Sequence, residues 1–429
     1  MKIDKIPSIL VCLLFSLIFA FSQNNTRSPY SLNELGEINF LGNISNISMG
    51  GVDSAIDSIE YNINNPSSLA KLKTTNYQIG TFYKSMGISN SVSTERANAA
   101  NINYIAIGIP VKRFGFGFGV LPYSSLGFNL QTSEEFNNEN IIDTRFFGAD
   151  GNLNRAFVSL GIPLHKYFSI GATINYNFGK FSYEKYNQYD GINYGTYSNS
   201  SSEITGFTYS LSSSISFPLK NDVSLNLVYN YNLSDYLNSY NTEFIYTSTS
   251  SSISAESLGD FVDVNLANSG LENTSLLVPK KSIYSIGLEK KNKWFLGAQF
   301  ENKMSSEFEN KFLDIKNVLY RDSKILSIGG YFIPDASSLT SYWKRVIYRF
   351  GVKNEEKSII INNLPINHFS LNLGLGLPLS GLSKANLGLE FGKIGDDNNS
   401  LRENYAALRL GLSLNDIWFI KRKLSLIHI

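Results

Sequence analysis

Residues 370–377 read Ser-Leu-Asn-Leu-Gly-Leu-Gly-Leu, and residues 406–414 read Ala-Ala-Leu-Arg-Leu-Gly-Leu-Ser-Leu. Large aliphatic residues recur at every second position, which is the period of a β-strand with one apolar and one polar face. The solvent face of a soluble sheet rarely carries so many glycines and charges of the buried type. Because the pattern repeats along the chain, it predicts an all-β fold, a transmembrane antiparallel β-barrel with its apolar faces toward lipid.

Alternating segments of this kind occupy most of the chain after residue 75. They lie near residues 76–92, 98–111, 114–130, 152–163, 167–186, 203–218, 222–240, 281–290, 293–306, 324–333, 343–354, 367–378, 383–394 and 404–416. The total of about fourteen is even, as a single-chain outer-membrane barrel requires. Most segments reach the roughly 9 to 11 residues that a tilted strand needs to cross a membrane.

The phase of each strand follows from its alternation. Ile174 and Tyr176 are expected to face lipid, with Asn175 between them facing the lumen. A slip of one residue near the end of the chain would turn Glu390 into the bilayer, so the register is strongly specified.

The lengths of the connections suggest an orientation. Short connections are expected at residues 112–113, 165–166, 220–221 and 290–292, and long ones at 131–151, 187–202, 241–280 and 395–403. Outer-membrane barrels have short periplasmic turns and longer extracellular loops. The long, Ser-rich connections are therefore expected outside the cell, and both ends of the barrel in the periplasm.

The N-terminus resembles a secretory signal peptide. Lys2 and Lys5 precede an apolar run over residues 9–19, and small residues precede an expected cleavage after Ser22. The alternative, a helical membrane anchor, would need a longer apolar run. Cys12, the only cysteine, lies within this run, so neither a disulfide nor thiol catalysis is expected.

Composition and residue types also bear on activity. The formal net charge of +1 gives no electrostatic case for a nucleic-acid partner. His165, His368 and His428 have no acidic or serine partner at a spacing typical of a catalytic site, and the sequence has no His/Cys cluster of the kind that binds a metal. Neither a cofactor nor an enzymatic activity is therefore expected. A barrel lipase that pairs His368 with one of the many serines stays open as an alternative.

Residues 23–75 do not alternate. Their apolar residues are numerous enough to pack inside the lumen as a plug, and a barrel of this size has a lumen wider than its own side chains fill. A loose periplasmic tail is the alternative, for which the Gly and Asn residues are typical. The expected organisation is a signal peptide (1–22), a plug or hatch (23–75), the barrel (76–416) and a periplasmic tail (417–429).

The chain resembles the FadL-type outer-membrane transporters of long-chain fatty acids and other hydrophobic compounds, in the version common in Bacteroidetes. The resemblance rests on the glycine-rich run ending at Met49-Gly50-Gly51, on Asn65-Pro66-Ser67, and on the closing stretch 403–423. It implies a plug that gates the lumen, formed around those two motifs. Ser67 departs from the usual Ala, and the tail 424–429 follows the last strand instead of a terminal aromatic.

The resemblance also implies a kink in the third strand that opens the wall and releases a hydrophobic ligand into the outer leaflet. Pro122 falls on that strand, followed by Gly127, and proline removes a ladder hydrogen bond. The alternative is that Pro122 only ends the strand near its extracellular rim.

Arginines on the polar faces are candidate contacts for a ligand carboxylate, which a guanidinium binds as a fork. These are Arg155, Arg345, Arg349 and Arg409. The alternative is that they pair with lumen carboxylates.

Two functions follow. The first is passive uptake of fatty-acid-like molecules by a monomeric outer-membrane barrel whose partners are the hydrophobic ligand and outer-membrane lipid. The second is a PorV-like docking or assembly subunit of an outer-membrane protein secretion machine, in which the barrel joins a larger complex.

Overall fold

The computed structural model describes residues 26–32, 34–90, 93–136, 141–189, 191–248, 258–313, 318–396, 398–399 and 401–417. The expected signal peptide and nearly all of the expected C-terminal tail lie outside these residues. Within the described ranges, no helix has the length and hydrophobicity needed to cross a membrane.

The elements are mostly strands. The strands are β1 (Glu37–Ile38), β2 (Thr75–Ser89), β3 (Thr94–Val111), β4 (Phe114–Phe136), β5 (Ile141–His165), β6 (Phe168–Tyr189), β7 (Gly195–Pro218), β8 (Val223–Asn232), β9 (Asp235–Ser248), β10 (Leu258–Asp263), β11 (Asn273–Val278), β12 (Lys281–Lys290), β13 (Trp294–Lys303), β14 (Val318–Tyr320), β15 (Ser323–Phe332), β16 (Ile347–Ile361), β17 (Leu364–Pro378), β18 (Lys384–Ile394) and β19 (Arg402–Asp416). The helical segments are η1 (Pro29–Leu32), α2 (Ile44–Ile47), η2 (Pro66–Lys71), η3 (Lys220–Asp222), η4 (Ser305–Glu307) and η5 (Trp343–Arg345).

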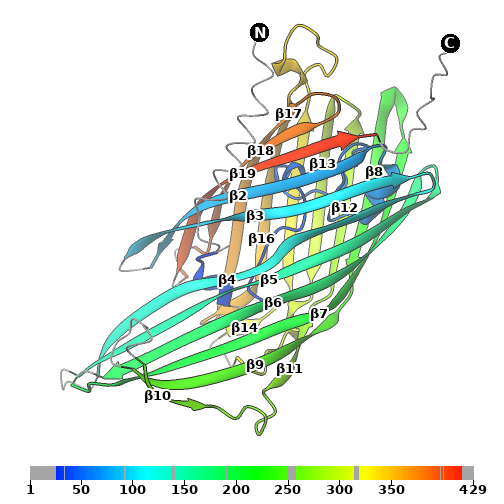
Figure 1. The fold of residues 1–429 in the computed structure, drawn as a ribbon. Coiled ribbons are helices and arrows are strands. Elements are labelled where there is room, and N and C mark those ends of the chain that lie inside the picture. Colours follow the sequence, from blue (N-terminus) through cyan, green and yellow to red (C-terminus); the bar gives the residue numbers. More distant parts are fainter. Residues whose placement is uncertain are drawn as a thin grey trace, which may run out of the picture.

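The strands close into one antiparallel barrel (Figure 1). Around the wall the order is β2 to β8, then β12, β13 and β15 to β19, and β19 pairs with β2 from Arg402↔Ser89 to Asp416↔Thr75. This wall has 14 strands. The prediction of an all-β outer-membrane barrel with an even strand number is confirmed.

The phase predicted from alternation is also confirmed. Ile174 and Tyr176 are exposed on the outer face of β6, whereas Asn175 is buried. Glu390 is buried on the inner face of β18. The register that keeps this carboxylate out of the lipid pairs it with Ala407 of β19.

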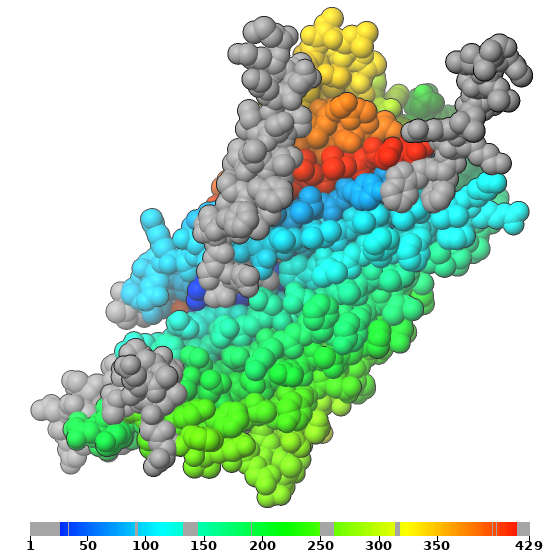
Figure 2. Space-filling model, viewed as in Figure 1, coloured from blue at the N-terminus to red at the C-terminus, as the bar shows by residue number. Residues whose placement is uncertain are grey.

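The predicted long connections were wrong in three places, because the strands continue through them. β4 and β5 pair as far as Phe136↔Ile141, β6 and β7 as far as Asn187↔Thr196, and residues 241–280 contain most of β9 and all of β10 and β11. Ladder hydrogen bonds do not need lipid, so pairing persists where the outer face becomes polar. Figures 1 and 2 show these strands running past the shorter β17 and β18 at one end.

The other end of the barrel carries most of the tight turns, together with the start of β2 and the end of β19, and we call it the turn end. By the usual arrangement of outer-membrane barrels it faces the periplasm. Connection length alone does not separate the two ends, since the opposite end has short connections at residues 90–93 and 362–363.

Residues 26–32 and 34–74, which we call the inner segment, lie inside the barrel (Figure 1). Their side chains and backbone bond to inward-facing residues around the wall, including Ser212, Ser285 and Gln299. The apolar side chains Ile44, Val52 and Leu69 are buried there.

Candidate functional site

The barrel wall is open between β3 and β4. The two strands pair only from Ile105↔Val120 to Val111↔Phe114. Beyond this point β3 pairs with β2 and β4 pairs with β5. The opening begins directly after Val120, the last of the exposed apolar side chains in the first part of β4.

Pro122 lies where the two strands part. The ladder between β4 and β5 shifts register between Pro122 and Ser124, so Tyr123 is bulged. Phe118 and Val120, before the bulge, face outward, whereas Leu126 and Phe128, after it, are buried inside the barrel. All four positions are even-numbered and would share one face in a regular strand. The extra residue has therefore turned the face of the strand over, as a β-bulge does. The strand continues to Phe136, so Pro122 does not end it.

The inner segment covers part of the open edge of β4. Strand β1 pairs with it through Glu37↔Ser125 and Ile38↔Ser124, and the amide of Asn39 donates to the carbonyl oxygen of Tyr123 at 2.9 Å. Further along, the amide of Gly127 donates to Ser31 Oγ at 3.1 Å. A Cβ on Gly127 would lie 2.3 Å from the carbonyl oxygen of Thr26, so this close approach requires glycine.

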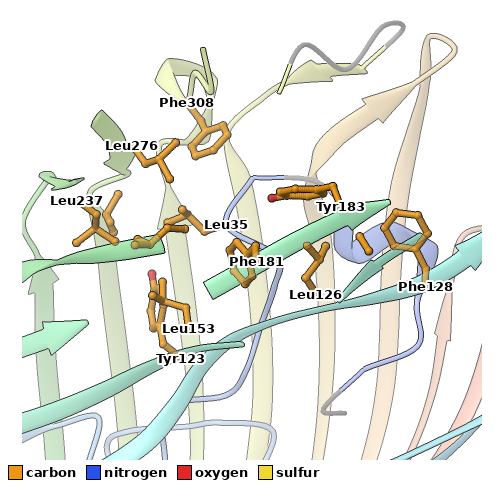
Figure 3. Packing of buried hydrophobic residues seen from close by; sticks show 13 residues of the cluster. Leu35, Tyr123, Leu126, Phe128, Leu153, Phe181, Tyr183, Leu237, Leu276 and Phe308 are labelled. Atoms are coloured by element: carbon orange, nitrogen blue, oxygen red, sulfur yellow. The ribbon is translucent and has the colours of Figure 1, made fainter. Parts of the chain in front are cut away.

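An apolar cluster lies inside the barrel beside the opening (Figure 3). Strands β4, β5, β6, β7, β9 and β11 contribute to it, and the inner segment contributes Leu35. Its buried members are Leu35, Tyr123, Leu126, Phe128, Ala149, Leu153, Phe181, Tyr183, Ile204, Leu237, Leu276, Val278 and Phe308. Partly buried Leu32, Ile38 and Leu41 of the inner segment pack against it. Phe147, Leu313 and Tyr320 pack against it from the rest of the chain, so the inner segment covers one part of the cluster.

Arg155 joins this cluster to a polar cavity. Its guanidinium lies 3.8 Å from the ring centroid of Tyr123, and its Nε donates to Asn177 Oδ1 at 2.9 Å. The side chain is 6% exposed and lines a cavity of about 190 Å³. None of the ion pairs among the described residues includes Arg155, although the same cavity holds several acidic residues.

The other three predicted arginines have different surroundings. Arg409 donates from Nη2 to Glu390 Oε2 at 2.6 Å, so it is already paired. Arg349 is buried and donates from Nη1 to Asn386 Oδ1 at 3.0 Å. The expectation that Arg345 faces the lumen from a strand is corrected, because it lies in η5 at the turn end, over the ring of Tyr342. The strand predicted to begin at residue 343 begins at Ile347, and the bulky Tyr342-Trp343 pair precedes it in a helical turn.

Ion pairs line the polar cavity beside the apolar cluster. Lys281 Nζ lies 3.3 Å from Glu301 Oε1, Lys353 Nζ lies 3.1 Å from Glu355 Oε2, and Lys303 pairs with Glu34 of the inner segment. Burial alone would raise the pKa of Glu37, but the neighbouring Lys84 ammonium lowers it to about 2. These pairs lie between the apolar cluster and a second one, in which Ile44, Leu69 and Leu72 pack the inner segment against the wall.

Met49-Gly50-Gly51 forms a tight turn directly after α2. Gly50 and Gly51 have φ of 70° and 89°, and their amides donate at 2.9 Å to the carbonyls of Ile47 and Asn46. This turn lies flat against β15 and β16, where a Cβ on Gly329 would approach the Met49 carbonyl oxygen to 2.0 Å.

Asn65-Pro66-Ser67 forms the start of η2 and contacts the opposite wall. The Ser67 amide donates to Ser212 Oγ of β7 at 2.7 Å, and Ser67 Oγ donates to Asn65 Oδ1 at 2.6 Å. A Cβ on Gly171 of β6 would lie 2.3 Å from the Ser67 amide nitrogen. In the 14-strand wall, β6 is separated from β16 by β7, β8, β12, β13 and β15, so the two motifs brace the inner segment across the lumen.

Sequence reasoning missed the apolar cluster, although one signal was available. On β6 the outward apolar series ends at Phe178, and the next apolar residues, Phe181 and Tyr183, are of opposite parity and point inward. Within one strand, the apolar residues thus pass from the outer face to the inner face. Such a change indicates where the outer surface of the barrel no longer contacts lipid.

A family model, BamG, matches residues 2–425 of the chain. The chain belongs to the BamG family. A comparison with curated proteins finds no match.

Among solved structures, this BamG-family chain has the fold of the FadL-type barrels. The Pseudomonas putida toluene transporter TodX aligns with 13% identity and a TM-score of 0.57 over 89% of this chain and 99% of its own. The Ralstonia pickettii toluene transporter TbuX aligns with 11% identity and a TM-score of 0.56, over 88% and 99% respectively. A FadL homologue from Pseudomonas aeruginosa gives the same four values as TbuX. The resemblance to FadL-type barrels is therefore confirmed for the fold.

Proposed function

We propose that this barrel takes up hydrophobic small molecules with an acidic head group, such as long-chain fatty acids, across part of the outer membrane. The observation that carries the proposal is that three features lie together. They are the apolar cluster, the opening between β3 and β4, and the buried Arg155, which has no carboxylate partner among the described residues. The names of TodX and TbuX as toluene transporters support uptake of a hydrophobic compound.

In the proposed route, the apolar tail enters the cluster and replaces contacts now made by Leu32, Leu35 and Ile38. Each buried CH₂ contributes about 0.8 kcal/mol to binding. The head group binds at Arg155, where a carboxylate accepts two parallel hydrogen bonds from the guanidinium.

The inner segment acts as the gate. Movement of residues 31–39 away from the edge of β4 uncovers the opening beside Pro122, and the ligand leaves sideways into the outer leaflet. The turn at Met49-Gly50-Gly51 and the Asn65-Pro66-Ser67 motif hold the rest of the segment against opposite walls, so only its first part needs to move. The passage is diffusion and requires neither a catalytic residue nor a cofactor.

The test combines uptake and binding. Cells with and without the protein are given radiolabelled oleate, and the purified barrel is titrated with a fluorescent fatty acid that oleate displaces. We expect saturable uptake that disappears with the deletion, and binding that weakens about tenfold or more in Arg155→Leu, as for the loss of a charge-assisted pair. Arg113→Leu, in a turn-end connection, is the matched control. Absence of both uptake and binding would overturn the proposal.

A further inference from the structure

The connection between β15 and β16 differs from every other described connection at the turn end. It comprises residues 333–346, whereas the connections at 112–113, 166–167, 219–222, 291–293 and 379–383 are short. It projects from the turn end, in gold near the top of the view (Figure 1). We call it the turn-end loop. A long connection at this end is not needed to join two neighbouring antiparallel strands, for which two residues suffice.

The turn-end loop is held by its own hydrogen bonds. The Asp335 amide donates to the Lys344 carbonyl at 2.8 Å, which closes the base of the loop. Asp335 Oδ1 accepts from the amide and hydroxyl of Ser337, at 3.0 and 2.7 Å, and these bonds lower the pKa of its carboxyl. Tyr342 donates its hydroxyl to the Pro378 carbonyl at 3.1 Å and so ties the loop to β17. The loop therefore presents a defined surface.

That surface is apolar at its most prominent positions. Leu339 is 98% exposed and Trp343 is 63% exposed. The ring of Tyr342 stands at 80° to that of Trp343, with a centroid separation of 6.0 Å, and Arg345 lies over Tyr342. Large apolar side chains that lie together and exposed on an ordered loop are typical of an interaction site. Trp, Tyr and Arg are the residue types that dominate the energetics of protein interfaces.

The surrounding charge indicates the kind of partner. The turn-end connections carry Lys112, Arg113, Lys166, Lys220, Lys291, Lys293, Lys344 and Arg345. Their acidic residues are Asp222 and Asp335, and the Asp335 carboxyl is engaged by Ser337. A surface with this excess of cations attracts an acidic partner and repels a basic one.

We propose that the turn-end loop docks a periplasmic protein that has an acidic surface surrounding an apolar pocket. Leu339 and Trp343 occupy the pocket, and Lys293, Lys344 and Arg345 face the acidic rim. The proposal concerns the opposite end of the barrel from the apolar cluster and does not depend on uptake of any ligand.

The first experiment is crosslinking in intact cells. The photoreactive residue p-benzoylphenylalanine replaces Leu339, or Leu382 of the neighbouring connection as a matched control, which is 46% exposed on the same rim. We expect one protein adduct at position 339 that is absent at position 382 and absent when Lys293→Glu and Lys344→Glu are combined. No protein adduct, or adducts with lipid alone, would overturn the proposal and show instead that the loop is free or enters the membrane.

The second experiment measures the interaction with purified components. The crosslinked protein is produced alone and titrated onto the full-length barrel in lipid nanodiscs. We expect Trp343→Ala and Leu339→Ser each to weaken binding by about tenfold or more, and added salt to weaken it further, whereas Leu382→Ser leaves it unchanged. Heat-dependent migration of each variant in gels verifies that the barrel is folded. Binding that survives both the apolar substitutions and charge reversal would refute the assignment.

Discussion

Gly351→Ala tests whether the inner segment is held by close backbone contact with the wall. A Cβ on Gly351 would lie 2.1 Å from the Gly50 amide nitrogen and 2.3 Å from the Met49 carbonyl carbon. Ordinary contacts between such atoms are about 3.5 Å or more, so the turn would have to move by over an ångström. Both groups it meets are backbone, and the left-handed φ angles of Gly50 and Gly51 leave the turn little freedom to adjust.

The expected cost is at the upper end of the range for overpacking, about 3 kcal/mol. Since each 1.4 kcal/mol is a factor of ten, undocking of the turn should become more frequent by about a hundredfold. Cysteine accessibility measures this directly. Val52 is fully buried in the inner segment beside Phe295, and Val52→Cys supplies a thiol whose reaction with a maleimide requires the turn to leave the wall.

Gly87→Ala is the matched control, because the nearest heavy atom to its added Cβ is 4.0 Å away. In the Val52→Cys background, we expect Gly351→Ala to raise the labelling rate by about a hundredfold and Gly87→Ala to leave it unchanged. Both barrels should remain folded, as their gel migration would verify. Equal labelling of the two variants would refute the argument that the wall glycines fix the inner segment.

Three further predictions concern buried groups. Burial raises the pKa of Asp53 to about 7, against the opposing hydrogen bonds from Asn62 and Asn64, so its charged form is disfavoured in the docked state. Docking should therefore weaken as pH rises from about 4 to 7 and stay level above that. Because the thiolate fraction of any cysteine also rises over this range, the Val52→Cys labelling rate is divided by that of the urea-unfolded protein at each pH. This ratio should rise with pH when Asp53 is present and should not change in Asp53→Asn. Arg409→Leu leaves Glu390 buried without its cation and should destabilise the barrel by about 3 kcal/mol in urea unfolding, whereas adding Glu390→Leu should recover much of the loss. Pro122→Ala restores a backbone donor at the opening, so β3 and β4 should pair further and oleate uptake should fall; unchanged uptake would count against Pro122 as the cause of the opening.

The barrel could be predicted from sequence because the alternation within each strand by itself indicates which side chains face lipid. Alternation at Ile174, Asn175 and Tyr176 is local, and the face that meets lipid tolerates no misplaced charge. The ends of the strands were less predictable. Beyond Pro122 and Phe178 the apolar residues lie on the inner face, in the apolar cluster, so the outward apolar alternation is lost although pairing continues through β4 to β7.

The site was harder to predict for a different reason. The sequence identified Pro122 and Arg155. The opening, however, depends on where β3 stops pairing with β4, and no single residue of β3 indicates that position. Arg155 and Arg409 look alike in sequence, each on a polar strand face. Only the packing shows that Glu390 pairs with Arg409 while Arg155 lies beside Tyr123.

The packing inside the barrel bears on the direction of the proposed passage. A straight path to the periplasm would take an apolar tail through the braced part of the inner segment, where Ile44, Leu69 and Leu72 already pack against the wall. The tail could pass only after these contacts had been broken. The opening beside Pro122 adjoins the apolar cluster, and only the first part of the inner segment covers it. A ligand that leaves there breaks fewer contacts, and for this reason we propose lateral exit rather than passage to the periplasm.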